Sequence, residues 1–488
     1  MHRWPIGRGT ADALLRPIMK LRHVSLAILA GVAPSVSRAQ PTPAAKLVPA
    51  APIAAPINDE LAAFDKDIDA LFAAGGMTAD QAAARAGAAS PTVRRKAAEV
   101  EVAIAQAETA ELIQVPQLSA KLAATKLSSL PALNLGGFAI AFPSHDYVAT
   151  ATLSVPLSDY LLKFPKLIDA ARLGTETAKL SRRSSEISAG QDARLAYYEL
   201  VRARLQVLVA QRSLAQVQAT LGQVQALADN QRLSKADLMR VQSQEAQAEQ
   251  IVDQLQNLAD LREEQLRLLI GAGPEDKVTL GEDVRPDLGV AAAGSLEQMM
   301  GTAKQHRLEF KVLETGIAAK EKQRASEDAN QYPKLSAFAT GDYENPNPRV
   351  FPSEDKFKFT WAAGVQLTWS LNDTLVSRTK DRQLLAETDE LRADRESLER
   401  GTRLEVLAAQ QAVALAQHAL TTTAKGLAAA QESYRVRREL LAAERATAVD
   451  LVDTETDLTR ARIAALNARV DLRVAVAQLG HALGNDTK

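Results

Sequence analysis

Residues 447–484 read TAVDLVDTETDLTRARIAALNARVDLRVAVAQLGHALG, which is one uninterrupted helical pattern. Thr447 stands three residues before Asp450, the spacing of a capping box with Asp in the place of Glu. Gly484 closes the pattern, and glycine is the usual residue just past a helix end. The stretch therefore predicts a helix of about 35 residues, roughly 50 Å long, with Thr447 as its N-terminal cap.

Two apolar seams run along this predicted helix. Leu451, Leu458 and Leu472 belong to a seven-residue repeat, with alanines three places further on. A second seam passes through Ile463 and Val470, about 200° round the helix from the first. A helix with seams on opposite sides needs a neighbour on each side. The pattern therefore favours a wall of helices over an isolated two-helix coil.

An earlier part of the chain repeats this pattern. Ser234 stands three residues before Asp237, as a second predicted hairpin cap, and the helical pattern that follows ends at Gly271. The aspartates are 450 − 237 = 213 residues apart, and the glycines 484 − 271 = 213. Other pairs recur in the same order at similar offsets, among them Leu153–Asp159 with Leu367–Asp373 and Thr78–Gln81 with Ser295–Gln298. An ordered series of such matches predicts that the chain is an internal duplication.

Each half has the same predicted plan: a leading helix, a strand pair, a very long helix of about 70 residues and a return helix of half that length. The leading and return helices, stacked end to end, would match the long helix. The predicted domains are a first repeat at 78–271, a linker at 272–294, a second repeat at 295–484 and a tail at 485–488. We expect leading helices at 78–114 and 295–331, strand pairs at about 117–157 and 333–371, and helical hairpins at 160–270 and 373–483.

The N-terminal residues have the pattern of a secretion signal at 1–39. Lys20 and Arg22 precede an apolar run, and Ser37 and Ala39 supply the small residues of a cleavage site, with Met19 as an alternative start. Residues 40–77 predict a Pro- and Ala-rich arm with a short helix. We expect an exported protein without a lipid anchor, because the sequence has no Cys to lipidate.

The strand pairs decide the class of protein. Apolar and polar or small residues alternate over 357–371, the period of a strand with one apolar face, and the stretch is long enough to cross a membrane. The predicted membrane-facing residues are Phe357, Phe359, Trp361, Val365, Leu367 and Trp369. A soluble sheet with one buried face is the alternative. Residues 147–157 alternate in the same way, and segments 117–127 and 334–343 are weaker partners.

Four strands cannot close a barrel by themselves. Open sheet edges are not tolerated in lipid, so the sheet must close with copies of itself. Three chains would supply twelve strands. We therefore expect a mainly α-helical chain with a small membrane β part, completed as a trimer.

With these features, the chain resembles the TolC family of outer-membrane efflux and secretion channels over about residues 78–484. The duplicated plan, the Ser/Thr-x-x-Asp-Leu turns and the glycine endings carry the resemblance. It implies a homotrimer in the outer membrane of a Gram-negative bacterium, contacting lipid through a twelve-stranded barrel above a twelve-helix periplasmic tunnel. It also implies two partners, a periplasmic adaptor (membrane fusion protein) and an inner-membrane pump of the RND or ABC type.

The resemblance also implies a periplasmic entrance. The family carries acidic rings there in a Val-Asp-x-x-Asp pattern, which Asp450 and Asp453 match. Six carboxylates in a narrow throat would attract cations. The alternative for Asp450 is a capping role alone, whereas Asp453 has none. In the family an Arg before this turn latches onto an Asp of the other hairpin, which here would be Asp237; Ala446 occupies that Arg position, with Arg445 one residue early.

Composition argues against other classes. The 58 basic and 59 acidic residues balance, so nothing favours nucleic-acid binding. The histidines show no metal spacing, and no phosphate loop or nucleophile elbow appears, so we expect no enzyme and no cofactor. Three functions remain: a small-molecule efflux channel, a type I protein-secretion channel of the same architecture, and a periplasmic coiled-coil adaptor. The sequence does not identify the substrate or the resting state of the entrance.

Overall fold

The computed structural model describes residues 57–131, 133–140, 142–230, 233–286, 288–289, 294–351, 353–443 and 445–487. The predicted secretion signal and the arm up to residue 56 lie outside these ranges. The chain divides into a unit of Met1–Pro52 and a unit of Ile53–Lys488. All the elements below belong to the second unit, which is mainly helical with a small antiparallel sheet.

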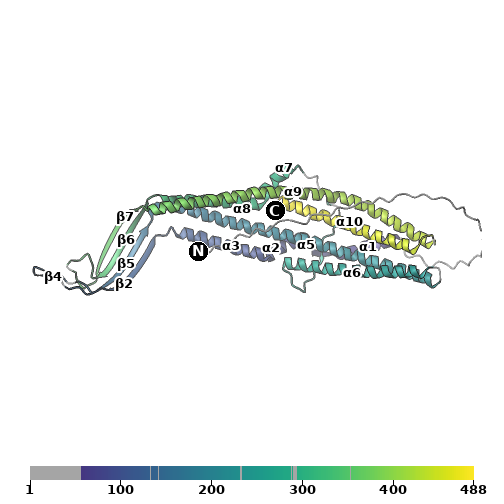
Figure 1. Ribbon diagram of the computed structural model, residues 1–488, viewed down its shortest axis with the longest axis horizontal. Helices are drawn as coiled ribbons and strands as arrows, with labels where there is room; N and C mark the ends of the chain where they lie inside the picture. Colours follow the sequence, from purple (N-terminus) through teal and green to yellow (C-terminus); the bar gives the residue numbers. More distant parts are fainter. Residues whose placement is uncertain are drawn as a thin grey trace, which may run out of the picture. The chain divides into compact units, whose positions relative to one another are not determined.

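One very long helix forms the frame of each half. Helix α5, Phe164–Asp229, has 66 residues, and α9, Leu371–Ala442, has 72, so they extend roughly 100 Å and 108 Å at 1.5 Å per residue. They return through α6, Lys235–Ile270, and α10, Ala448–Ala482, with 36 and 35 residues. Both hairpins turn at the same end (Figure 1). These lengths agree with those expected from the sequence.

The segment before each strand pair is two helices rather than the single helix that the sequence predicts. The first pair is α2, Ala79–Ala89, with α3, Pro91–Leu112, and the second is α7, Leu296–His306, with α8, Leu308–Glu327. The first break lies at Ser90, whose backbone is extended (φ −58°, ψ 126°) because the ring of Pro91 disfavours helical angles at the preceding residue. Arg307 is extended as well (φ −66°, ψ 126°), without a proline.

Each return helix ends against the break in the leading pair. Gly271, which follows α6, is left-handed (φ 67°), and a Cβ there would lie 2.6 Å from the Cβ of Ala89. Gly484, which follows α10, is left-handed (φ 74°), and a Cβ there would lie 2.8 Å from the backbone nitrogen of Arg307. Glycine is the residue that tolerates both the backbone conformation and the close approach. Each glycine therefore ends its helix and lets the helix abut the leading pair.

The four long strands form one antiparallel sheet in the order β2-β5-β6-β7, at the end away from the hairpin turns (Figure 1). They are β2, Gln117–Lys126, β5, His145–Val155, β6, Lys334–Asn345, and β7, Lys358–Thr368. The central pair β5–β6 joins the two halves of the chain. The loop after β2 contains a separate small hairpin of β3, Leu133–Leu135, and β4, Phe138–Ile140. Short helix α4, Leu157–Leu162, follows β5, and 3-10 turns lie at Asp328–Gln331 and Asn485–Thr487.

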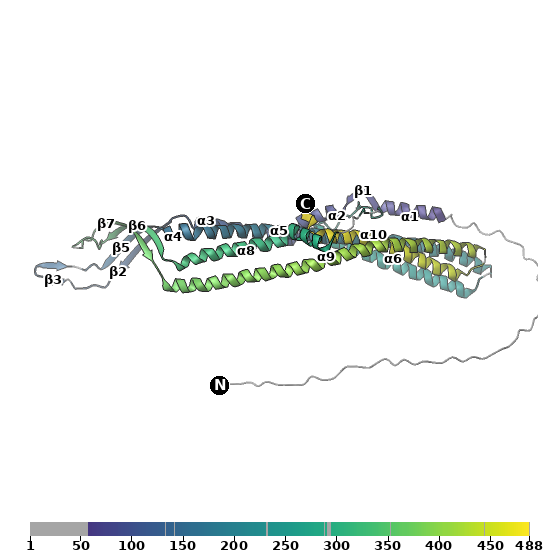
Figure 2. The same ribbon diagram turned by 90° about the horizontal axis from the view of Figure 1, so that it is seen from above.

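The helices lie side by side in a wall (Figure 2). Next to the sheet, the contacts run in the order α3, α5, α8, α9. Next to the hairpin turns, they run in the order α6, α5, α10, α9. Helix α9 therefore forms one edge of the wall over its whole length, and α3 and α6 form the other.

Helix α10 has a neighbour on each side, as its two seams predict. Leu451 and Leu458 of the first seam pack against Tyr434 of α9, and Leu472 packs further along the same helix. Val470 of the second seam packs against α5 together with Ile463. The period of the sequence therefore identifies both packing faces of this helix.

The main core lies where the N-terminal elements cross the wall. Helix α1, Ile57–Leu71, and strand β1, Phe72–Met77, pack over α5, and β1 makes bridges to Leu280 of the linker. Tyr197 and Leu200 of α5 are fully buried there beside Leu280. The linker between the repeats is thus partly a core element, which its Gly- and Pro-containing sequence does not indicate.

Candidate functional site

One face of the sheet is apolar from edge to edge. The registers of the three strand pairs place alternate residues of all four strands on this face. Its members are Leu118, Ala120, Leu122, Ala124, Tyr147, Ala149, Ala151, Leu153, Val155, Leu335, Ala337, Ala339, Gly341, Tyr343, Phe359, Trp361, Ala363, Val365 and Leu367. Leu122 is 86% exposed and Val365 70%, so nothing in the described part of the chain covers these positions of the face. A water-exposed apolar surface of this extent is the pattern of a lipid-facing strand set.

The opposite face is polar and balanced in charge. Its strand residues include three carboxylates, Asp146, Asp342 and Glu344, and three amines, Lys121, Lys334 and Lys358. The Thr150 hydroxyl donates a hydrogen bond of 2.9 Å to Asp342 across the central strand pair. The remaining positions are mostly Ser, Thr, Gln and small residues, as a water-filled interior requires.

Aromatic side chains border the apolar face at both ends. Near the loops, the Tyr343 and Phe357 rings stack with centroids 5.0 Å apart, and the Tyr147 ring lies 6.3 Å from Phe357. Near the helices, Tyr332 and Trp369 are exposed. Belts of this kind suit the two membrane–water interfaces. All six residues predicted to face the membrane are exposed in the structure.

Sequence reasoning missed the contribution of the first strand pair. Leu118 and Leu122 are among the most exposed large apolar side chains, yet the segment 117–127 looked weak because its alternation is interrupted by alanines. Pairing with β5 reveals that Ala120 and Ala124 belong to the same face, whereas Ala123 lies on the opposite face.

Both edges of the sheet are free within the chain. Among the described strands, β2 pairs with β5 alone and β7 pairs with β6 alone. Each edge therefore presents a row of backbone N–H and C=O groups over about ten residues without a ladder partner in this chain.

At the far end, Thr447 and Asp450 cap α10. The Asp450 backbone N–H donates to the Thr447 hydroxyl at 3.1 Å, and the Thr447 N–H donates to the Asp450 carboxylate at 3.1 Å. Arg437 of α9 faces the same carboxylate, with Nη1 3.8 Å from Oδ2. The Thr447 N–H and hydroxyl, aided by Arg437, lower the pKa of Asp450 below its ordinary value. Asp450 is therefore a cap and a charged residue at the hairpin tip at the same time.

The other hairpin is capped by Ser234. Its hydroxyl accepts the Asp237 backbone N–H at 3.1 Å and donates to the Asp237 carboxylate at 2.6 Å. Asp453 and Arg445 are exposed at the tip of the α9–α10 hairpin. Among the described residues, no ion pair joins Asp237 to Arg445. The structure thus brings Thr447 together with Asp450 and Ser234 with Asp237, and leaves the expected latch unformed within one chain.

The two tips are joined by contacts that the sequence did not single out. Val452 of α10 packs with Val224, Leu238 and Val241 of the α5–α6 hairpin. Thr220 donates a hydrogen bond of 2.8 Å to Glu455, which is only 2% exposed. A glutamate within a long helix reads as a solvent-facing residue, and no pattern within the helix marks Glu455 as buried.

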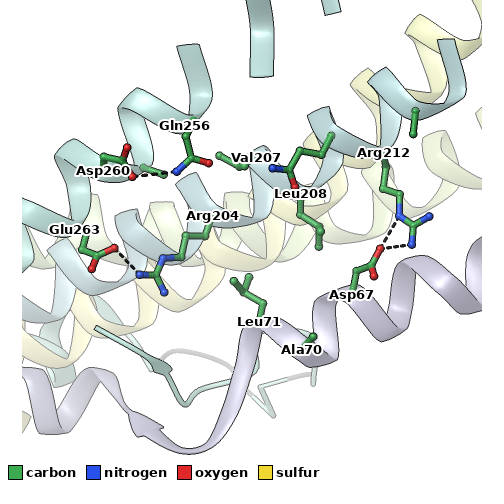
Figure 3. A pocket seen from close by; sticks show the side chains of 13 residues that line it. Asp67, Ala70, Leu71, Arg204, Val207, Leu208, Arg212, Gln256, Asp260 and Glu263 are labelled. Atoms are coloured by element: carbon green, nitrogen blue, oxygen red, sulfur yellow. Dashed lines mark hydrogen bonds and ion pairs between the residues drawn. The ribbon is translucent and has the colours of Figure 1, made fainter. Parts of the chain in front are cut away.

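A groove with a volume of about 740 Å³ lies on α5 between α1 and α6 (Figure 3). Its rims carry ion pairs between Arg212 and Asp67 and between Arg204 and Glu263, the latter at 2.6 Å. Its floor is apolar, with Val207 and Leu208. The groove's lining holds no His, Ser, Cys or Tyr, and two of its three carboxylates, Asp67 and Glu263, are paired with arginines.

Two searches of the described residues were negative. No group of three or more His, Cys, Asp or Glu side chains among them is placed to hold a metal ion. In the same residues, no helix has the combination of length and apolar character that crossing a membrane would need.

Residues 299–485 match the family model described as outer membrane efflux protein. The matched residues make up less than half of the chain and lie almost wholly in the predicted second repeat. This match agrees with the resemblance that the sequence motifs carry. No curated protein matches the chain. The fold of the first half rests on comparison with solved structures.

Three solved structures share the fold over most of the chain. The outer membrane protein VceC of Vibrio cholerae has a TM-score of 0.69 at 17% identity, covering 83% of this chain and 96% of that one. The CmeC outer membrane channel of Campylobacter jejuni has a TM-score of 0.70 at 12% identity, covering 86% and 87%. The open state of the MtrE outer membrane channel of Neisseria gonorrhoeae has a TM-score of 0.66 at 17% identity, covering 84% and 89%. Two of these three proteins, CmeC and MtrE, are described as outer membrane channels.

Proposed function

We propose that three copies of this chain form an exit duct across the outer membrane, which passively conducts small molecules delivered by a periplasmic adaptor and an inner-membrane pump of the RND or ABC type. The observation that carries the proposal is the apolar sheet face that ends in two unpaired edges. The match of residues 299–485 to the outer membrane efflux protein model supports an efflux role.

The free edges support closure with other copies. In lipid, each backbone N–H or C=O without a partner costs several kcal/mol, so β2 of one copy must pair with β7 of the next. Two copies would give eight strands, a barrel whose interior is just filled by its own side chains. Three copies would give twelve and leave a lumen lined by the polar face.

The helical wall supports the same assembly. Its free edges, α9 on one side and α3 with α6 on the other, carry exposed apolar residues such as Leu404 and Leu415 on α9 and Ile251 and Leu261 on α6. Joining these edges would close a tunnel of twelve helices below the barrel. The tips of the hairpins would then surround an entrance near Asp450 and Asp453.

The alternatives are less well supported. A type I protein-secretion channel would have the same architecture, but the family description favours efflux. A periplasmic adaptor would not need a sheet with an exposed apolar face. Deletion of the gene in its host separates the first two: we expect greater susceptibility to dyes and antibiotics. Unchanged susceptibility, with the loss of one protein from the medium, would favour secretion instead.

Cysteine cross-linking tests the assembly directly, because the natural chain has no Cys. Ala120→Cys on β2 would be combined in turn with Cys at Trp361, Ala363 or Val365 on β7. We expect at least one pair to give covalent dimers and trimers on denaturing gels of outer-membrane fractions. Ala151→Cys is the matched control, because β5 already has a neighbour on each side. A monomer for every pair, from protein located in the outer membrane, would contradict the proposal.

Export to that membrane requires the N-terminal signal. We propose cleavage after Ala39 and no lipid on the mature chain. Sequencing the N-terminus of protein from outer membranes tests this, with Gln40 expected as the first residue.

A further inference from the structure

We propose that Arg437 sets the ion selectivity of the entrance by neutralising Asp450, so that of the two aspartates Asp453 alone acts as an uncompensated negative charge. The inference rests on the proposed function and assigns the charge balance of its entrance.

The contact crosses the hairpin. Arg437 lies near the end of α9, Asp450 lies in the first turn of α10, and the guanidinium is 3.8 Å from the carboxylate. Both side chains remain about two-fifths exposed, at 43% and 41%, so each can also act on ions passing nearby. The Asp450 carboxylate accepts the Thr447 N–H as well. The cap therefore holds the carboxylate in place while Arg437 compensates its charge.

Two other charged groups of the tip, Arg435 and Asp453, have different surroundings. Arg435, two residues earlier, is bound on its own helix by Glu432 at 2.5 Å and Glu439 at 2.7 Å. Asp453 is exposed and has no side-chain partner in the described part of the chain. Three chains would thus place three compensated and three uncompensated carboxylates around the entrance, rather than the six free ones expected from the sequence.

The strand residues of the barrel do not change the charge balance that the entrance sets. The polar face of the sheet carries as many lysines as carboxylates, so its strand residues impose no net charge on the lumen. Ion selectivity should therefore depend on the charge at the hairpin tips, where a ring of like charges surrounds the narrow entrance.

Single-channel reversal potentials in a salt gradient test the inference. Removing Arg437 should raise the ratio of cation to anion permeability. One unit charge about 4 Å from an ion in water changes the local ion concentration about fivefold. Screening by salt reduces this change to about two-fold or more. We expect Arg437→Gln to raise the ratio and Arg437→Lys to preserve it. Asp450→Asn and Asp453→Asn should each abolish cation preference. The double variant Arg437→Gln with Asp450→Asn should return to the natural ratio.

Arg435→Gln is the matched control, since it makes the same change of charge two residues away but does not face Asp450. We expect its ratio to stay near the natural value. Pores with an unchanged ratio in Arg437→Gln, or an equal change in both arginine variants, would overturn the inference and leave the proposed function intact. Trimers that insert but never conduct would contradict the proposed function itself, and the inference with it.

Discussion

The hydrogen bond between Thr220 and Glu455 offers a sharp test of how the two hairpin tips are held together. The Thr220 hydroxyl donates to the Glu455 carboxylate at 2.8 Å, and the two residues are 4% and 2% exposed. The bond joins α5 to α10, the two neighbours in the middle of the wall. Thr220→Val removes the donor while keeping the branched shape of the side chain.

The expected cost follows from the burial of both partners. A buried acceptor that loses its donor costs about 1–3 kcal/mol, because water cannot replace the lost bond. Taking about 2 kcal/mol, and a factor of ten for each 1.36 kcal/mol, the local opening of α10 from α5 becomes roughly thirty-fold more frequent.

Hydrogen exchange measures this opening. In the purified full-length protein, we expect backbone amides of α10 around residues 448–460 to exchange roughly thirty-fold faster in Thr220→Val, with little change in α3 or the sheet. Thr454→Val is the matched control, because the Thr454 hydroxyl bonds only to its own helix, at the carbonyls of Asp450 and Leu451. Equal exchange in both variants, or none above the natural protein in Thr220→Val, would refute the reasoning.

Three further predictions concern other parts of the chain. Gly484→Ala should destabilise the protein by at least about 1–2 kcal/mol in thermal unfolding, because the left-handed backbone at Gly484 disfavours a side chain. Gly222→Ala is the control: Gly222 lies inside α5 with open space around it, so this change should be neutral or stabilising. Burial raises the pKa of Tyr197 to about 12. Its folded pKa exceeds its unfolded value near 10, so the stability that it contributes is present below pH 10 and lost as pH rises towards 12. Burial also raises the pKa of Tyr198, so absorbance at 295 nm should show these two tyrosines still protonated at about pH 11. Ala363→Lys on the apolar face should reduce membrane insertion by about 2–4 kcal/mol, while Ala362→Lys on the polar face is tolerated, as outer-membrane fractionation would measure.

Elements with a long, regular period were predictable from the sequence. The two hairpins of α5 with α6 and α9 with α10 follow from seven-residue seams and matching glycine endings, and β7 follows from its strict alternation. The breaks at Ser90 and Arg307 were not. Pro91 marked the first break, since a proline disfavours helix at the residue before it. The second has no local signal and depends on the end of α10 packing there.

At the hairpin tips, only the contacts between residues close together in the sequence were predictable. The caps of Ser234 and Thr447 follow from residues three places apart, which fold against each other within one turn. The contact of Arg437 with Asp450 depends on how two helices face each other across a turn. The buried Glu455 depends on a neighbour more than two hundred residues earlier. Spacing within one helix does not contain that information.

The character of the contact between α5 and α10 changes along its length. Near the core, Val470 and Leu466 are buried against apolar residues of α5. Towards the tip the contact includes polar pairs, with the Thr459 hydroxyl donating to Ser213 at 3.0 Å and Thr220 bound to Glu455, and Val452 packs with Val224 of α5 at the end. The contact of α10 with α9 stays apolar over the same stretch. Separating apolar surfaces exposes area that water penalises, whereas water can satisfy separated polar groups. If the entrance of the assembled protein widens, α9 and α10 should therefore move as one body, and the tips should part between α10 and α5.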